Sequence, residues 1–273
     1  CLLSRGLGDV YKRQISGQVA SSTIGTDAFQ EVDMVGITRH CVKHNFLVKQ
    51  VDGLANTIKK AFYLARTGRP GPVIIDVAKD VTQALHKFCY PQEQPFIRSY
   101  QPVIHAHKGQ IKKAVQLFAL AKRPVVFFGG GIVLANAEEE LRRWIQLTGV
   151  PCISSLMGLG AYSASHPQFL GMVGMHGTYE ANMAMQQADM VLALGVRFDD
   201  RVISVPEKYL ATAKKIIHID IDPSSIAKRV PVNVPIVGDI KLALQAMTYQ
   251  WEEKRLILDH KGLQCWWECI EQW

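Results

Sequence analysis

The sequence predicts an α/β fold: a doubly wound parallel sheet in a central domain, preceded by part of a second α/β domain. Two observations support this prediction. Short runs such as PVVFF and MVLAL are apolar at every position, which is typical of strands buried on both faces of a parallel sheet. Stretches with apolar residues three and four positions apart alternate with these runs, as helices covering both faces of a sheet would.

The first part of the chain predicts a helix that leads into a buried strand. Residues 53–67 show helical spacing of apolar residues, and Gly68 ends the helix before the apolar run in GRPGPVIIDVA. These elements are too few for a complete α/β domain. We therefore interpret residues 15–85 as the C-terminal part of one, and residues 1–14 as an N-terminal junction outside it.

A second domain is expected over residues 107–250. The Pro-containing stretch at 86–106 predicts a linker before it, and residues 251–273 are expected to begin another linker. Within this domain the pattern predicts helices at 109–121, 137–148, 178–187 and 239–250, and strands at 124–129, 151–155, 189–195, 215–221 and 234–238.

Composition excludes several classes of protein. The 273 residues are 48% apolar and carry 31 Lys and Arg against 24 Asp and Glu, a net charge of +7, which is enough apolar surface for a sizeable core. The longest apolar runs are strand-sized, so we expect no membrane span, and no secretory signal is evident. The basic residues are spread over helix faces without stacking aromatic residues, which argues against nucleic-acid binding. Six scattered cysteines without metal-ligand spacing indicate reduced thiols, no metal site and a cytoplasmic protein.

Ligands of open parallel sheets bind at the carboxyl ends of the strands, so the residues that follow each strand are the candidates. Gly129, Gly130 and Gly131 follow PVVFF, where missing side chains let a phosphate or ribose lie against backbone amides. The triplet lacks the GxGxxG spacing, and a tight strand-to-helix turn is the alternative interpretation.

Charged residues follow another strand. Arg197, Asp199, Asp200 and Arg201 come after MVLALG, and two arginine forks at a strand end favour phosphate or carboxylate binding over a solvated salt-bridged loop.

Three further residues complete the candidates. Asp220 lies at a strand tip, where a ribose is often bound, whereas Asp222 in DPSS has the position of a helix N-cap. His176 lies in a turn rich in Gly and Met that could accept a flat ring, although a lone His is more often structural. Together these features predict a nucleotide or dinucleotide site on a Rossmann-like sheet, without specifying a reaction.

Several motifs in order resemble the catalytic large subunit of acetolactate synthase (acetohydroxyacid synthase), a thiamine diphosphate-dependent enzyme. They are GQVASSTIGTDAFQEVDMVGITR, GRPGPVIIDVAKDV, SLMGLGAY, LGMVGMHGTYEAN, GVRFDDR and HIDIDPSSI, and RSYQP, AHKGQIK and WWECIEQW are most similar to the isozyme III type. The resemblance covers residues 15–273. It implies condensation of two pyruvates, or of pyruvate and 2-ketobutyrate, with decarboxylation to acetohydroxyacids in isoleucine and valine biosynthesis. The alternatives are another flavin-containing enzyme of the pyruvate oxidase or glyoxylate carboligase type, against which GTDAFQE and RFDDR argue, and a non-catalytic nucleotide-binding module.

The resemblance also implies a set of site residues. FAD would be held structurally in the central domain, and residues 15–85 would belong to the domain that binds the thiamine pyrimidine. Arg201 would bind the carboxylate of the second ketoacid, Gln30 and Lys43 would belong with it to the catalytic set, and Phe29 and Met175 would line the substrate channel. The implied FAD-binding residues are Arg69, Gly129, Gly130, Gly131, His176, Gly177, Gly195, Arg197, Asp199, Asp220, Ile221 and Asp239, with Ser155, Leu156 and Met157 lining the same groove.

The main thiamine diphosphate and Mg²⁺ ligands of this family would precede Ile15 and follow Trp273. We therefore expect a fragment that is inactive by itself, because a carbanion catalyst needs both ends of its cofactor held. The resemblance further implies a homodimer or tetramer of large subunits and a small regulatory subunit as partners.

Overall fold

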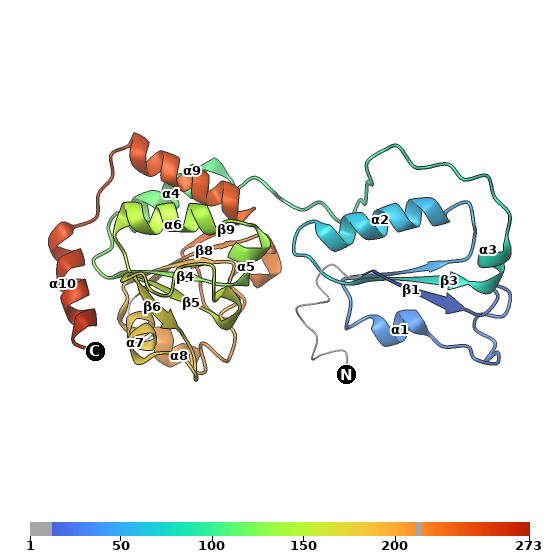
Figure 1. The fold of residues 1–273 in the computed structure, drawn as a ribbon, viewed down its shortest axis with the longest axis horizontal. Coiled ribbons are helices and arrows are strands. Elements are labelled where there is room, and N and C mark those ends of the chain that lie inside the picture. Colours follow the sequence, from blue (N-terminus) through green and yellow to red (C-terminus); the bar gives the residue numbers. More distant parts are fainter. Residues whose placement is uncertain (1–12, 211–213) are drawn as a thin grey trace. The chain divides into compact units, whose positions relative to one another are not determined.

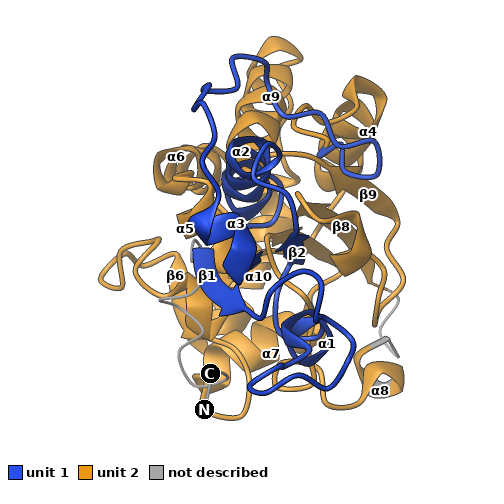
Figure 2. Ribbon diagram, turned by 90° about the vertical axis from the view of Figure 1, so that its right-hand side faces the viewer, with its two compact units in different colours: residues 1–102 blue, residues 103–273 orange. Residues whose placement is uncertain are grey.

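The computed structural model describes residues 13–210 and 214–273, so the predicted junction lies almost entirely outside the described residues. The chain divides into two compact units, Cys1–Pro102 and Val103–Trp273, coloured separately in Figure 2. The division falls within the stretch expected to be a linker, and residues 84–107 contain neither helix nor strand.

Unit 1, Cys1–Pro102, is built on a three-stranded parallel sheet with the order β1-β3-β2. The central strand β3 is buried at all six positions, because strands flank its two edges and helices pack on the faces of the sheet. Helix α2 packs Ala61, Leu64 and Ala65 on one face of the sheet, and α1 lies on the other face (Figure 1). The elements are β1 (Arg13–Gln18), α1 (Met34–Thr38), β2 (His44–Val48), α2 (Leu54–Arg66), β3 (Val73–Ala78) and α3 (Lys79–Gln83).

Unit 2, Val103–Trp273, contains a six-stranded sheet with the order β6-β5-β4-β7-β8-β9, and every neighbouring pair is parallel. Helices α4, α6 and α9 cover one face, and α7 and α8 lie on the other (Figure 1). The strands are β4 (Pro124–Phe128), β5 (Cys152–Ser154), β6 (Phe169–Met172), β7 (Met190–Leu194), β8 (Lys215–Asp220) and β9 (Val234–Val237). The helices are α4 (Lys108–Phe118), α5 (Gly130–Leu134), α6 (Glu138–Thr148), α7 (Tyr179–Gln187), α8 (Pro206–Leu210), α9 (Ile240–Glu253) and α10 (His260–Glu271), and η2 (Leu156–Gly158) and η3 (Pro223–Ser225) are short 3₁₀ turns. The predicted α/β class is confirmed.

The strand order locates the candidate binding edge of unit 2. The chain runs outward from β4 through β5 to β6, then returns to the other side of β4 and continues from β7 to β9. The direction of winding therefore reverses between β4 and β7. In open α/β sheets the crevice beyond the carboxyl ends at such a reversal is the usual binding site.

Aromatic side chains fill the core of unit 2 beneath α4, α6 and α9. Phe118, Trp144 and Trp251 come from three helices, and their ring centroids lie 5.4 to 6.0 Å apart. All three are buried. Edge-to-face and tilted contacts of this kind stabilise the core beyond simple burial, so they fix α4, α6 and α9 against one another.

The structure differs from the sequence-based expectation at the C-terminal end. Residues 251–273, expected to begin a linker, contain helix α10 instead. Trp266 is 1% exposed and donates a hydrogen bond to the carbonyl of Pro124 at 3.1 Å, and Trp267 donates to the carbonyl of Gly149 at 3.0 Å. Two indole rings that find both apolar packing and hydrogen-bond acceptors on unit 2 hold this segment there as a helix.

Candidate functional site

Two glycine turns meet at the switch point of the unit 2 sheet. The amide of Gly129 donates to the carbonyl of Leu194, and the amide of Gly131 donates to the carbonyl of Gly195. A Cβ atom on Gly195 would lie 2.5 Å from the Cα of Gly131, and one on Gly131 would lie 2.6 Å from the Cα of Gly195. Gly195 also has a φ of 58°. Gly129, Gly131 and Gly195 are therefore required by the close approach of the β4 and β7 turns.

Apolar side chains are exposed beside these glycines. Ser155 follows β5 and its amide donates to the carbonyl of Phe128 at 2.9 Å. The next two residues, Leu156 and Met157, are 67% and 47% exposed, and a Cβ on Gly130 would lie 3.1 Å from the Cβ of Met157. This places a small apolar surface directly against the glycine backbone, where a flat ring could lie.

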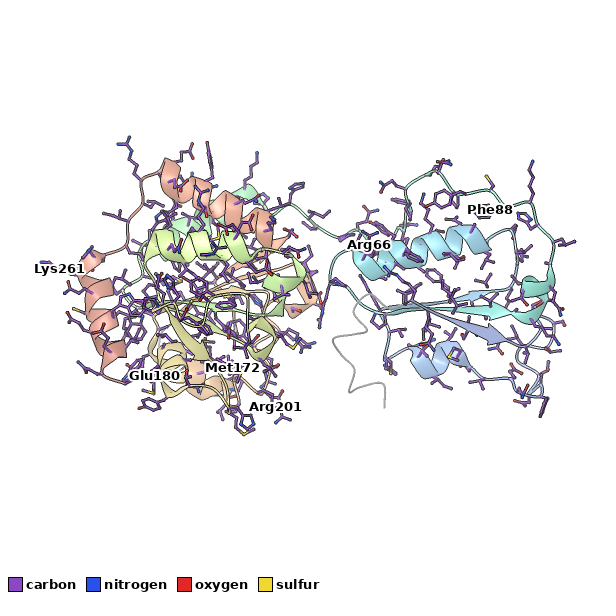
Figure 3. All side chains as sticks on the ribbon, viewed as in Figure 1. Arg66, Phe88, Met172, Glu180, Arg201 and Lys261 are labelled. Carbon is purple, nitrogen blue, oxygen red and sulfur yellow. The ribbon has the colours of Figure 1, made fainter. Side chains whose placement is uncertain are left out.

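The turn after β7 presents its arginine outward. Val196 and Phe198 are buried, and Arg197 between them is exposed. Arg201 lies at the same end of the unit and is also exposed (Figure 3). Neither arginine forms an ion pair within the described residues, so the salt-bridged alternative for this loop is not seen there. Asp199 accepts a hydrogen bond from the amide of Arg201 at 3.2 Å and closes the turn.

Three aspartates lie at or just beyond the ends of β8 and β9. Asp220 is 8% exposed, and its carboxylate accepts the amide of Asp222 at 2.8 Å, across the partly buried Ile221. Asp222 accepts the amide of Ser224 at 2.9 Å, so the predicted N-cap is confirmed. Asp239 likewise caps α9, with one oxygen 3.1 Å from the amide of Leu242.

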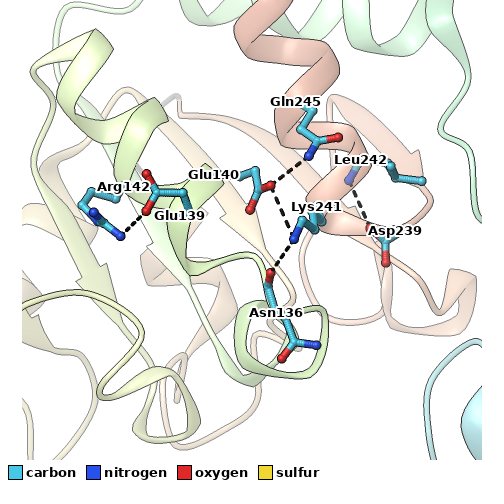
Figure 4. A network of polar contacts seen from close by, with 8 residues as sticks. All are labelled: Asn136, Glu139, Glu140, Arg142, Asp239, Lys241, Leu242 and Gln245. Atoms are coloured by element: carbon cyan, nitrogen blue, oxygen red, sulfur yellow. Dashed lines mark hydrogen bonds and ion pairs between the residues drawn. The ribbon is translucent and has the colours of Figure 1, made fainter.

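A polar network holds the start of α9 near the start of α6 (Figure 4). Gln245 donates to Glu140 at 2.8 Å, and Lys241 lies 3.7 Å from the same carboxylate. Lys241 also donates to the carbonyl of Asn136 at 3.2 Å. Because Asp239 begins α9, the network also fixes the position of that aspartate.

The Gly and Met rich turn after β6 is locked by a residue that sequence reasoning missed. The Asn182 side chain accepts a hydrogen bond from the amide of Gly174 at 2.9 Å and donates one to the carbonyl of Gly174 at 3.0 Å.

The candidate residues of this turn are exposed: Met175 is 74% exposed, and His176 is also exposed. A Cβ on Gly177 would lie 2.1 Å from the carbonyl oxygen of Met172, so a glycine is needed there. The role of Asn182 could not be read from the sequence, because no spacing rule distinguishes it from any other polar residue on a helix.

The candidate residues of unit 1 lie in two places. Phe29 is 90% exposed, and Gln30 has a left-handed φ of 63°. The carboxylate of the neighbouring Glu31 accepts the amides of Gly25 and Ala28, and these hydrogen bonds lower the pKa of Glu31. The turn therefore presents Phe29 and Gln30 on the surface of the unit.

Lys43 has a different environment from the one expected of a residue in the catalytic set. Its ammonium donates to the carbonyls of Leu64 and Thr67 at 2.6 and 2.7 Å and to the hydroxyl of Tyr100 at 2.7 Å. A cation on the last carbonyls of a helix stabilises its C-terminal end. Lys43 thus holds the end of α2, and the exposed Arg69 follows in the next turn.

Sequence reasoning also missed a surface groove of about 530 Å³ in unit 1. Lys59, on its wall, donates to the carbonyls of Pro91 and Glu93 and so holds the adjoining chain against α2. Figure 3 labels Arg66, another lining residue. The groove is lined by Lys59, Phe62, Tyr63, Arg66, Thr67, Gln92, Gln94 and Pro95.

The part of the chain that the structure describes contains neither a cluster of metal ligands nor a helix that could span a membrane. Across residues 13–210 and 214–273, no three His, Cys, Asp or Glu side chains gather as metal ligands would. In the same part of the chain, no helix combines the length and apolar character needed to cross a bilayer.

Comparison with known families then assigns the fold. Residues 111–247, half of the chain, match the family described as thiamine pyrophosphate enzyme, central domain. The chain belongs to this thiamine pyrophosphate enzyme family. The matched residues run from α4 to α9 and include the whole glycine-lined edge.

Relatives in this family carry the name that the motifs indicated. The chain is 52% identical to the acetolactate synthase large subunit of Haemophilus influenzae over 262 residues, which is 95% of this chain and 45% of that protein. It is 49% identical to the acetolactate synthase isozyme 3 large subunit of Escherichia coli over 260 residues, again 95% and 45%. Acetolactate synthase of Mycobacterium leprae is 47% identical over 230 residues, 84% of this chain and 36% of that protein. The predicted resemblance is confirmed, and the chain spans less than half the length of these relatives.

Proposed function

We propose that the carboxyl edge of the six-stranded sheet binds FAD, and that the protein acts in acetolactate synthesis. The observation that carries the FAD site is the pair of turns at Gly131 and Gly195, whose backbones meet at the switch point with no room for side chains. Glycine turns that approach this closely at a switch point are typical of folds that bind dinucleotides.

The side chains around these turns fit the parts of a flavin dinucleotide. Leu156, Met157 and Met175 leave apolar surface exposed, which an isoalloxazine ring would cover. Arg197 supplies an exposed guanidinium for a phosphate, and Asp220 supplies a carboxylate at a strand end for a ribose hydroxyl. Asp239, Asp199, His176 and Gly177 complete the proposed contacts on the neighbouring turns.

In the proposed enzyme FAD serves as a structural cofactor without net redox change, and thiamine diphosphate with Mg²⁺ supplies the carbanion chemistry. The residues of this chain would bind and orient the substrates. Arg201 would bind the carboxylate of the second 2-ketoacid through its fork. Phe29, Gln30 and Met175 would line the approach for pyruvate or 2-ketobutyrate, and Lys43 would hold the end of α2.

The assembly is proposed on the same basis. The relatives are named large subunits, which supports association with further large subunits and with a small regulatory subunit. The 2-ketoacid substrates and a cytoplasmic location follow from the same proposed activity.

Flavin titration tests the binding site. Adding FAD to the purified chain should quench flavin fluorescence saturably. Arg197→Ala should weaken binding about tenfold, because a charge-assisted phosphate contact is lost. Arg142→Ala is the matched control, since this exposed arginine pairs with Glu139 on α6. Absence of saturable binding, or equal losses in the two variants, would contradict the FAD site.

Activity requires a separate test. The product of the complete gene should form acetolactate from pyruvate with thiamine diphosphate and Mg²⁺. Arg201→Gln should raise the concentration of the second ketoacid that gives the half-maximal rate. The FAD content of the protein should stay unchanged. If the protein made from the complete gene formed no acetolactate in the presence of thiamine diphosphate, the proposed reaction would be rejected. The FAD site would then be judged from the flavin titration alone.

A further inference from the structure

A buried histidine lies directly behind the turn that carries Arg197. His218 belongs to β8, is 0% exposed, and has its Nε2 atom 2.8 Å from the carbonyl oxygen of Val196. Its Nδ1 atom has no hydrogen-bond partner among the described residues. The Phe198 ring stands edge-on to the imidazole, with centroids 5.3 Å apart and planes at 90°. One imidazole therefore contacts both buried residues of the turn.

These contacts determine the form of the imidazole. A carbonyl oxygen can only accept, so Nε2 must carry the proton and donate it to Val196. A second proton, on Nδ1, would place a charge in apolar surroundings without an acceptor, and burial lowers the pKa of His218 to about 4. At neutral pH the ring is a neutral donor in a single tautomer.

The turn that His218 contacts has an unfavourable backbone conformation. Gly195 and Phe198 both have left-handed φ angles, 58° and 48°. Such a conformation costs free energy in a bulky residue such as Phe198 and persists only where surrounding contacts enforce it. Phe198 is 2% exposed and also packs on Phe127, with centroids 5.6 Å apart. The imidazole and the phenyl rings together supply the enforcing contacts.

The consequence for Arg197 follows from the order of residues. Val196 and Phe198 are held inward, so the residue between them must point outward. We infer that His218 is a positioning residue for the proposed dinucleotide site: its hydrogen bond to Val196 and its contact with Phe198 hold the turn in the conformation that presents Arg197 to an anionic group of the ligand. This inference rests on the FAD site proposed above.

Two substitutions separate the donor from the shape of the ring. His218→Phe keeps an aromatic ring of similar size but removes the donor. His218→Gln places an amide donor at similar reach. We expect His218→Phe to weaken FAD binding about tenfold, as expected from losing one buried hydrogen bond, and His218→Gln to restore affinity to within about threefold of the unsubstituted chain.

Thr148→Val is the control for general destabilisation. Thr148 is buried on the other face of the same sheet, and its hydroxyl donates to the carbonyl of Trp144 at 2.8 Å. This variant should lower the urea midpoint about as much as His218→Phe does, with unchanged FAD affinity. Equal FAD affinity in His218→Phe and the unsubstituted chain, or no recovery in His218→Gln, would overturn the inference.

A ligand-free measurement separates this inference from the FAD proposal. The amide of Gly131, in the β4 turn, donates to the carbonyl of Gly195, which begins the turn that carries Arg197, so hydrogen exchange at Gly131 reports whether that turn is held. His218→Phe should speed that exchange more than it speeds exchange of core amides such as that of Val126, and His218→Gln should reverse the change. Nitrogen NMR of the unsubstituted chain should show the Nε2-protonated tautomer. If the chain failed to bind FAD but these results held, only the FAD proposal would fall, whereas an Nδ1-protonated tautomer or uniform exchange would overturn the role of His218.

Discussion

The two units differ in what holds their neighbouring strands and turns together. In unit 2 the turns of β4 and β7 touch backbone to backbone, and helices cover both faces of the sheet behind them. In unit 1, side-chain hydrogen bonds connect β1 with β3 and with the loop at Val32. Asp76, 1% exposed in β3, accepts from Ser16 at 2.7 Å and from Gln18 at 3.0 Å, and Gln18 also donates to the carbonyl of Val32. Backbone packing tolerates almost no change of residue, whereas a polar network can lose one bond and still persist.

The largest expected effect tests the backbone contact in unit 2. Gly195→Ala should destabilise unit 2 by about 4 kcal/mol, because the new Cβ meets backbone atoms and the φ angle is left-handed. All five tryptophans lie in unit 2, so urea unfolding followed by tryptophan fluorescence reports on that unit. Gly160→Ala is the control: its φ is 90° but nothing lies within 4 Å of the new Cβ, so the expected loss is only about 1 kcal/mol. Similar losses in the two variants would show that the close approach is not what requires glycine.

Acid should destabilise unit 2 through His218. Its pKa is about 4 in the folded chain and near 6.5 when unfolded, so the unfolded state binds more protons between these values. The contribution of His218 to the free energy of unfolding is fully present above pH 6.5. It should fall by about 3 kcal/mol as the pH drops to about 4. The same fluorescence-detected unfolding, repeated with His218→Gln, isolates this contribution from that of the carboxylates. If the two pH profiles had the same slope, His218 would not be the group responsible.

An intermediate effect tests the polar network in unit 1. Asp76→Ala should leave Ser16 and Gln18 without their acceptor and destabilise unit 1 by about 2 kcal/mol. Hydrogen exchange measured over β1 and β3 should rise, while the tryptophan-detected unfolding of unit 2 stays unchanged. Glu93→Ala, an exposed carboxylate in the same unit, should change neither measurement. Unchanged exchange in β1 would contradict the importance assigned to this network.

The smallest effect concerns the end of α2. Lys43→Met should cost about 1 kcal/mol, because the ammonium no longer meets the carbonyls of Leu64 and Thr67. Faster hydrogen exchange in the last turn of α2 is the expected observation. Lys49→Met removes an exposed lysine and serves as the comparison. Equal exchange in both variants would contradict the role of Lys43 in holding the end of α2.

Most elements of unit 2 could be predicted because their signals are local. The helix expected at 137–148 is α6, Glu138–Thr148, and the strand expected at 189–195 is β7, Met190–Leu194. Strand β6 gave no signal, since it is four residues long and half-buried at each position. Helix α10 was missed because its apolar residues, including Trp266, bind to a surface formed by distant parts of the chain.

The candidate site shows the same division. Asp222 could be predicted as an N-cap because its partner is two residues away. The roles of Lys43 and Asn182 could not, since one caps a helix formed by later residues and the other locks a turn through side-chain geometry. The ligand roles of the remaining site residues stay predictions.

By itself, the sequence determined the α/β class, the order of most helices and strands, and the residues that follow each strand. Periodicity and capping depend on neighbours within a few positions, so they can be recognised in a linear chain. Only the tertiary structure decided that Gly131 meets Gly195, that His218 stands behind Val196, and that Asp76 collects Ser16 and Gln18. These contacts arise from the order in which strands pair and from the packing of side chains far apart in sequence, and no local pattern encodes either.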